Sequence, residues 1–302
     1  MYLKHFKLKR APFQLRPDEN FFYSSLGHAR AKALLAYSVW NRDGIAVVTG
    51  EAGTGKTTLV RQALARMPVD VYAIAIHQTQ LDELEFLRFL LARFGVSAFT
   101  FGKAQLLTEL NRALVHQRTL GRDVLLILDE AQHLDSRVLE ELRFLTGMQF
   151  AGKQIFNLIL VGQPSLTARL ASPEMRQFAQ RVRLHFELEA LSERETELYV
   201  AHRLTLAGAD SEGMIEQAAV TMIHEFSSGI PRLINVLADA ALTAAFVADT
   251  DQVRTSHVQA ALDELGWDEL KQSRRAADKG TGGVRGSSRH DEILRAIPRR
   301  IL

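Results

Sequence analysis

The sequence predicts an α/β domain built on a parallel sheet, followed by a smaller domain made only of helices. Up to about residue 190, short apolar runs alternate with stretches of helical periodicity, as in parallel strands joined by crossover helices. The run at 124–128 is continuously apolar, as expected for a strand buried on both faces. From 191 onward, every periodic stretch is helical.

Composition narrows the class of protein further. The chain has 302 residues, of which 47% are hydrophobic, so it contains enough apolar material for a large core. It has no cysteine, which excludes disulfides and thiolate metal sites. We find neither an apolar stretch of about 18 residues nor the apolar core of a signal peptide. These features predict a cytoplasmic protein.

The first 25 residues are rich in aromatic side chains and contain Pro12 and Pro17. Prolines at this spacing argue against one continuous helix. We therefore expect an extended lead that packs against the α/β domain. Helical periodicity begins at His28, just after this lead.

The central motif directly follows a predicted strand at 45–49. Residues 50–57 read GEAGTGKT and fit the P-loop pattern G-x-x-x-x-G-K-[ST], and a helical stretch comes next. Glycines allow the tight turn, Lys56 supplies a charge for the β- and γ-phosphates, and the Thr57 hydroxyl suits Mg²⁺. The predicted nucleotide-binding residues are Gly50, Glu51, Ala52, Gly53, Thr54, Gly55, Lys56, Thr57 and Thr58.

A second chemical element follows a strand at 71–76 and helices at 81–95 and 103–121. The strand at 124–128 ends in Asp129 and Glu130. Ligands of open α/β sheets bind at the carboxyl ends of strands. Asp129 is therefore predicted to hold Mg²⁺ through water, and Glu130 to orient or deprotonate the attacking water. An acidic helix cap is the alternative, which the upstream P-loop disfavours.

Further polar candidates follow along the chain. A helix is expected at 138–148 and a strand at 155–162, with Gln163 directly past the strand's end. The Gln163 amide is suited to touch the γ-phosphate or the water, although a Gln-Pro turn explains it nearly as well. A helix predicted at 172–182 carries Arg176 and Arg181, and a last strand follows at 183–190.

The helical region contains one notable cation, Arg232. It lies in the first turn of a helix that begins at Pro231. A cation at that end opposes the helix dipole, and a γ-phosphate nearby would relieve the conflict. An exposed arginine with acidic neighbours is the alternative interpretation.

The end of the chain differs in charge from the rest. Residues 271–302 contain nine Lys and Arg against three Asp and Glu, a balance of +6, which leaves −4 on the remainder. Gly and Ser are frequent there, so we predict a disordered tail. The alternative is a docking segment for a protein partner, DNA or an anionic membrane surface.

Together these segments resemble the AAA+ ATPases, and within them the ExeA/GspA-type secretion ATPases. The resemblance covers about 1–268 and rests on TGEAGTGKTTL, LLILDEAQHL, LILVGQPSL, MRQFAQRV and SGIPRLINVL. It implies a five-stranded αβα domain at 1–190 that includes the lead, a helical lid at 191–268, and a tail at 269–302. It also implies ATP and Mg²⁺ as ligands, and a ring or filament of identical subunits.

The resemblance assigns roles by position in this sequence. Lys56 and Thr57 match Walker A, and Asp129 and Glu130 match Walker B. Gln163 matches sensor 1, and Arg232 matches sensor 2. Arg181 or Arg176 matches the arginine finger that completes a neighbour's site, and the sequence does not separate the two.

Three functions follow as hypotheses. The first is an ATPase that drives assembly of a secretion, pilus or envelope/exopolysaccharide system, either in the cytoplasm or peripheral at the inner membrane. The second is an ATP-gated DNA-binding scaffold of the MuB/TniB transposition type. The third, a nucleotide-binding module without turnover, is disfavoured because both acids and the arginines are present.

Overall fold

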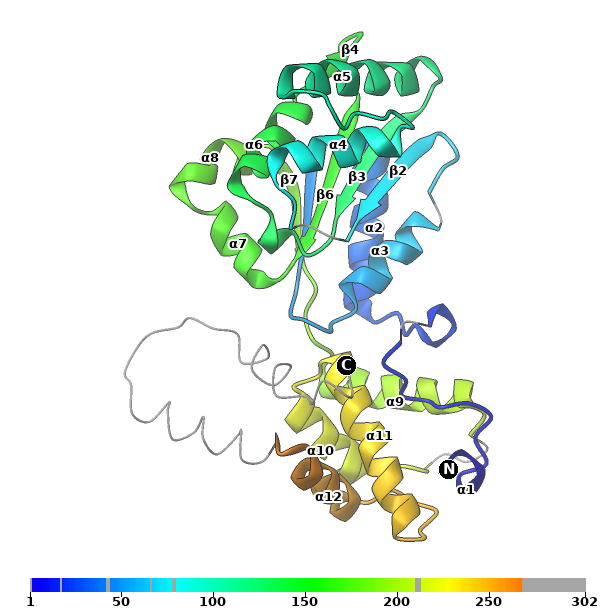
Figure 1. Ribbon diagram of the computed structural model, residues 1–302. Helices are drawn as coiled ribbons and strands as arrows, with labels where there is room; N and C mark the ends of the chain where they lie inside the picture. The colour runs from blue at the N-terminus through cyan, green and yellow to red at the C-terminus, as the bar shows by residue number, and fades with distance from the viewer. Residues whose placement is uncertain are drawn as a thin grey trace. The chain divides into compact units, whose positions relative to one another are not determined.

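The computed structural model describes residues 2–16, 18–41, 44–65, 67–77, 80–209 and 213–267. They form two compact units. Of the described residues, those within 26–50 and 56–188 form the sheet unit, and those within 2–25, 51–55 and 189–267 form the helical unit (Figure 1). The predicted basic tail lies outside the described residues.

A five-stranded parallel sheet forms the centre of the sheet unit, in the order β2-β3-β6-β1-β7. The strands are β1 (Ile45–Thr49), β2 (Val71–Ile76), β3 (Asp123–Leu128), β6 (Phe156–Gly162) and β7 (Val182–Glu187). β1, β3 and β6 are buried along their whole length, because helices cover both faces of the sheet. The predicted α/β fold with a five-stranded parallel sheet is confirmed.

Two apolar cores lie on opposite faces of this sheet. Ile45 and Val47 of β1 face one core, and Ala46 and Val48 face the other, as the two-residue repeat of a strand requires. The first core is covered by α4 (Glu83–Arg93), α5 (Lys103–Thr119), α6 (Ser136–Leu145), α7 (Pro164–Leu170) and α8 (Arg176–Ala179). The second is covered by α2 (Leu26–Asn41) and α3 (Lys56–Leu64).

The helix predicted at 172–182 is interrupted. A 3₁₀ turn, η3 (Pro173–Met175), precedes α8, and Met175 leaves helical geometry with φ −91° and ψ 4°. Met175 and Phe178 are both buried in the first core. Packing of these two side chains therefore overrides the uniform helical pattern seen in the sequence.

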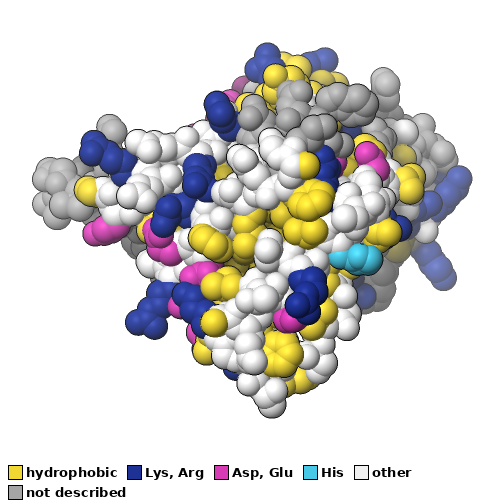
Figure 2. Space-filling model, turned by 90° about the horizontal axis from the view of Figure 1, so that it is seen from above, with side chains coloured by type: hydrophobic (Ala, Val, Ile, Leu, Met, Phe, Trp, Pro, Cys, Tyr) yellow, Lys and Arg dark blue, Asp and Glu magenta, His cyan; other side chains and the backbone are white. Residues whose placement is uncertain are grey.

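A small hairpin stands at the end of the sheet unit opposite the carboxyl ends of its strands. It pairs β4 (Gln149–Phe150) with β5 (Lys153–Gln154) around Ala151 and Gly152, both of which have positive φ. Figure 2 looks onto this end, where apolar side chains lie in separate groups among Lys and Arg. Phe150 of this hairpin is exposed, and the face drawn in Figure 2 mixes apolar, basic and acidic side chains.

Helices make up the second unit, as the sequence predicts. They are α9 (Glu193–Ala207), α10 (Gln217–Ser227), α11 (Pro231–Val247) and α12 (Thr255–Leu265). A capping box at Ser192 and Glu195 starts α9, and α11 begins with Pro231 at its first position. Within the described residues, no helix is both long and apolar enough to cross a bilayer.

The aromatic lead packs on the helical unit, which corrects the predicted placement against the α/β domain. It contains a short helix, α1 (Tyr2–His5), and a 3₁₀ turn, η1 (Glu19–Phe21), and its buried aromatic side chains join the core of α9–α12. The Tyr2 hydroxyl also donates a hydrogen bond to Asp239 on α11 (2.5 Å). Sequence proximity suggested the wrong partner, because the lead's contacts are with residues about 190 positions away.

A buried arginine fastens the lead to α9. Arg203 is 7% exposed, and its guanidinium donates to the carbonyl oxygens of Pro12 (2.5 Å) and Gln14 (3.3 Å) and to the Tyr199 hydroxyl (2.8 Å). It also lies over the ring of Phe21. Because a buried cation needs several acceptors to offset desolvation, these contacts hold the lead in one conformation.

Gly229, just before α11, allows the close approach of the chain to Leu191, just before α9. Its φ is +73°, and a Cβ at this position would fall on the carbonyl oxygen of Leu191. Gly229→Ala should therefore lower the free energy of unfolding by more than the ~1–2 kcal/mol that left-handed backbone alone costs. Gly266→Ala is the matched control, since φ is +67° and a Cβ there would meet nothing. Equal losses in chemical denaturation of the two variants would contradict this prediction.

Candidate nucleotide site

Several polar residues of the sheet unit gather where its parallel strands end, and all of them except His77 were predicted from the sequence. The loop after β1, His77 after β2, Asp129 and Glu130 after β3, and Gln163 after β6 all follow the carboxyl ends of their strands. These strands are parallel neighbours, so their ends meet at the same edge. The loop and the two acids therefore follow neighbouring strands at the same end of the sheet.

In the loop between β1 and α3, two of the three glycines have the positive φ that favours glycine. Gly53 and Gly55 have φ values of +88° and +100°, whereas Gly50 does not have positive φ. Lys56 is 6% exposed, and its Nζ donates to the carbonyl oxygen of Gly50 (2.8 Å). The ammonium group thus lies across the mouth of its own loop, which places a cation where phosphates would bind.

The remaining loop residues support this conformation. Thr54 is buried, and its hydroxyl and backbone N–H both donate to the carbonyl oxygen of Glu51, at 2.9 and 3.3 Å. Glu51 and Ala52 are partly exposed. Thr58 lies in the first turn of α3, directly behind the loop, and is also partly exposed.

The hydroxyl of Thr57 and the carboxylate of Asp129 meet although 72 residues separate them. Thr57 Oγ1 donates to Asp129 Oδ2 at 2.7 Å. The same oxygen lies 3.4 Å from Nδ1 of His77, whose side chain is 49% exposed whereas that of Asp129 is 5% exposed. This geometry brings two hard oxygen ligands of the kind Mg²⁺ prefers to one point beside the loop.

Glu130 is held by an amide that the sequence analysis did not single out. Its backbone is left-handed (φ 54°), and its N–H donates to Asp129 Oδ1 (3.0 Å). Gln132 Nε2 donates to Glu130 Oε2 (2.6 Å), while Gln132 Oε1 accepts the backbone N–H of Gln163 (3.1 Å). Gln163 itself caps α7 through its backbone position, without a capping hydrogen bond from its side chain.

Arg232 lies within the helical unit beside the tip of the loop, which belongs to the same unit. Its backbone N–H donates to the carbonyl oxygen of Gly53 (3.3 Å). A Cβ on Gly53 would come within 2.6 Å of the Arg232 Cβ, so only glycine permits this approach. The first turn of α11 and the loop tip are therefore neighbours.

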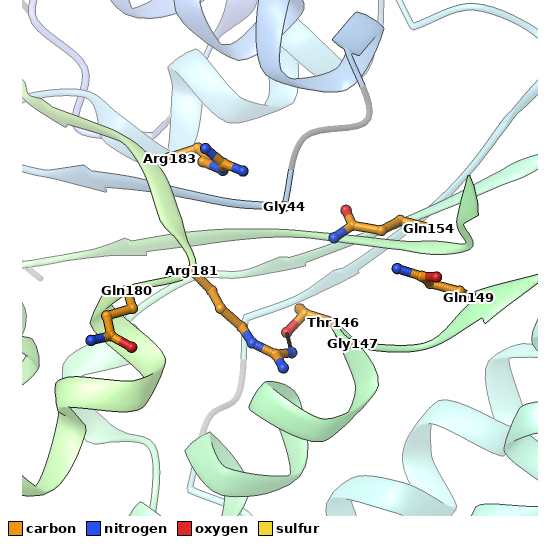
Figure 3. A pocket seen from close by; sticks show the side chains of 8 residues that line it. All are labelled: Gly44, Thr146, Gly147, Gln149, Gln154, Gln180, Arg181 and Arg183. Carbon is orange, nitrogen blue, oxygen red and sulfur yellow. Dashed lines mark hydrogen bonds between the residues drawn. The ribbon is translucent and has the colours of Figure 1, made fainter. Parts of the chain in front are cut away.

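The structure separates Arg181 and Arg176, which the sequence does not. Arg181 precedes β7, at the amino edge of the sheet, in a pocket of about 270 Å³ (Figure 3). Its guanidinium donates to the carbonyl oxygen of Arg143 (2.6 Å) and to Thr146 Oγ1 (3.4 Å), at the carboxyl end of α6. Arg176 is exposed at the start of α8, and among the described residues its guanidinium has no hydrogen-bond or ion-pair partner.

The sequence was compared with protein families and with known proteins. Residues 40–170 match the model of the AAA domain. General secretion pathway protein A of Aeromonas hydrophila is 34% identical over 266 residues, which is 88% of this chain and 48% of that protein.

The chain belongs to the AAA+ ATPases of the ExeA/GspA type. It spans about half the length of the Aeromonas relative. Phage Mu ATP-dependent target DNA activator B is 39% identical over 103 residues, covering 34% of this chain and 31% of that protein. Aeropyrum pernix ORC1, solved in complex with DNA, shares the fold with a TM-score of 0.63 and 18% identity, covering 89% of this chain and 73% of that one.

Two site residues of this ExeA/GspA-type chain were missed at the sequence level. His77 directly follows the apolar run 71–76, so its place at a strand's carboxyl end was a usable signal. Gln132 carried no comparable signal. Its importance comes from the end of β6, which lies 31 residues further along the chain.

Proposed function

We propose that this protein binds ATP with Mg²⁺ at the loop 50–57 and hydrolyses it to ADP and phosphate. The observation that carries the proposal is the 2.7 Å hydrogen bond between Thr57 and Asp129, which joins the loop's helix to the acidic end of β3. Lys56 lies at the loop mouth, and Glu130 follows Asp129 directly. These are the parts that phosphoryl transfer from ATP needs.

Each residue then has a separate task. The loop N–H groups and Lys56 bind the β- and γ-phosphates. The Thr57 hydroxyl and the Asp129 carboxylate fit Mg²⁺, because two oxygen ligands at one point leave room for phosphate oxygens and water. Bound Mg²⁺ would neutralise charge on the phosphates. Glu130 accepts a proton from the water whose oxygen attacks the γ-phosphorus, and ADP leaves.

A second subunit completes this site in our proposal. An arginine from the neighbour would stabilise the charge that develops on the γ-phosphoryl oxygens. The exposed guanidinium of Arg176 supports its assignment as this finger, whereas Arg181 is engaged by the end of α6. Arg232, beside the loop tip, and Gln163, at the end of β6, are proposed to contact the γ-phosphate within the subunit.

The biological process is proposed from the relative. The likeness to General secretion pathway protein A supports an assembly factor for a secretion, pilus or envelope/exopolysaccharide system. It would act in the cytoplasm or at the inner membrane surface. The helical unit would act as the lid over the nucleotide, and residues 269–302 would carry the contact to a protein partner or an anionic surface.

A second candidate is an ATP-gated DNA-binding scaffold. The partial likeness to ATP-dependent target DNA activator B favours it. Duplex DNA affinity measured in ATP at increasing salt separates the two candidates. A scaffold that contacts phosphates loses affinity steeply with salt because counterions are released, whereas an assembly factor for an envelope system need not bind DNA.

The proposed activity is tested by phosphate release from ATP. The wild-type protein should release phosphate only when Mg²⁺ is present, and Thr57→Val should raise the Mg²⁺ concentration needed because one ligand is lost. Thr108→Val, which removes an exposed hydroxyl on α5 that bonds only to its own helix, is the control. Equal turnover with and without Mg²⁺ would contradict the proposal.

A further inference from the structure

The amide of Gln132 connects two parts of the site that are otherwise separate in the sequence. Its nitrogen donates to the Glu130 carboxylate at 2.6 Å, and its oxygen accepts the backbone N–H of Gln163 at 3.1 Å. A hydrogen bond to an ionised carboxylate is among the stronger ones in a protein. A single planar side-chain amide thus joins the Glu130 carboxylate to the backbone at the end of β6.

The end of β6 is shaped to admit this amide. A Cβ on Gly162 would come within 2.8 Å of Gln132 Oε1 and within 2.9 Å of a Leu166 methyl group. The φ of Gly162 is not positive, so backbone conformation does not require glycine there. What requires glycine is the close approach of Gln132 and Leu166.

The backbone around Gln132 is fixed independently. Arg169 on α7 donates to the carbonyl oxygens of Gln132 and Leu134 and to Ser136 Oγ. α7 begins directly after Gln163. Helix α7 is therefore linked to Gln132 twice, through the Arg169 side chain and through the Gln163 backbone that precedes it. Anchoring of this kind holds a functional side chain near one orientation.

Glu130 needs such support because its own backbone is unusual. A non-glycine residue at φ 54° is left-handed, which costs roughly 1–2 kcal/mol, and the surrounding contacts must maintain it. The Gln132 amide takes one carboxylate oxygen, Oε2, and thereby fixes the direction of the other.

We propose that Gln132 is a positioning residue that orients the Glu130 carboxylate and ties its orientation to the position of the Gly162–Gln163 backbone. The inference rests on the proposed role of Glu130 as the base. A shift of the β6 end toward or away from a γ-phosphate is passed to Glu130 through this amide. The alternative is a purely structural role, in which Gln132 only stabilises the short turn η2 (Ala131–His133).

Three variants separate these interpretations. Gln132→Leu removes both hydrogen bonds at similar size. Gln132→Glu keeps an oxygen for the Gln163 N–H but sets a carboxylate against Glu130. Gly162→Ala displaces the amide without changing it. Gln149→Leu, an exposed position on the β4–β5 hairpin at the other end of the sheet unit, is the matched control.

The expected result is a split between turnover and binding. Gln132→Leu, Gln132→Glu and Gly162→Ala should each lower kcat about 10–100-fold, a part of the ~10²–10⁴-fold that a positioned base supplies. The Kd of a non-hydrolysable ATP analogue should stay within about twofold, because Lys56, Thr57 and the backbone N–H groups of the loop are untouched. Gln149→Leu should hydrolyse ATP at the wild-type rate.

Epistasis with Glu130 provides the decisive readout. In the Glu130→Gln background, Gln132→Leu should lower the residual turnover no further, because the amide acts only through the carboxylate. An additive loss, or a Gln132→Glu variant with wild-type kcat, would overturn the inference. If Glu130→Gln itself turned over at the wild-type rate, the proposed function would fail instead, so the two failures are distinguishable.

Discussion

Glu130→Gln is expected to bind ATP with wild-type affinity and to hydrolyse it about 10²–10⁴-fold more slowly. The substitution keeps the size of the side chain and can still meet Gln132, whose amide now lies 2.6 Å from the carboxylate. It removes only the group that accepts the water's proton. The groups that bind phosphate and Mg²⁺, at Lys56, Thr57 and Asp129, are unchanged.

Single-turnover hydrolysis and analogue binding measure the two halves of this prediction. Glu140→Gln on α6, whose side chain is 46% exposed, is the matched control and should behave as wild type. A Glu130→Gln protein that hydrolysed ATP at the wild-type rate would remove Glu130 from the role of base. Loss of analogue binding would instead mean that the Glu130 carboxylate is needed to maintain the conformation of the loop 50–57.

The second large effect concerns the arginine from a neighbouring subunit. Arg176→Ala should bind ATP normally yet lose turnover by as much as the ~10³–10⁵-fold attributed to such arginines. Mixing Arg176→Ala with Lys56→Ala should restore part of the activity. Mixed assemblies contain interfaces that pair an intact loop with an intact Arg176, and the recovery should grow with protein concentration.

Arg181→Ala has a different expected effect. Its guanidinium donates to the Arg143 carbonyl at the carboxyl end of α6, where a cation also complements the helix dipole. Its loss should lower the free energy of unfolding by about 1–3 kcal/mol. Arg112→Ala, an exposed arginine on α5, is the control for both variants. If the Arg181→Ala and Lys56→Ala mixture regains turnover while Arg176→Ala remains active, the two assignments are reversed.

The sheet and the loop could be predicted because their signals are local. The apolar run of β3 and the glycine pattern after β1 lie within a few residues of the chemistry they position. Parallel pairing then fixes that Asp129 lies at the same edge as the loop. Local pattern and fold rule together were sufficient for this part of the site.

Other features depended on distant partners and could not be predicted. The lead was assigned to the wrong unit because Arg203, which binds its carbonyl oxygens, is 191 residues from Pro12. The sequence did not separate Arg181 from Arg176, because the contact that distinguishes Arg181 is with the end of a helix that lies 36 residues earlier. Gln132 has no distinguishing sequence pattern, because its role requires the end of β6.

The central claim is that the loop 50–57 holds ATP together with Mg²⁺, and titration calorimetry of ATP into the protein tests it most directly. With Mg²⁺ present, the wild-type protein should bind ATP, and Lys56→Ala should bind at least about tenfold more weakly, because a charge-assisted hydrogen bond to phosphate is lost. Arg112→Ala should bind as the wild type does. Equal ATP affinity of the wild-type and Lys56→Ala proteins would contradict the account.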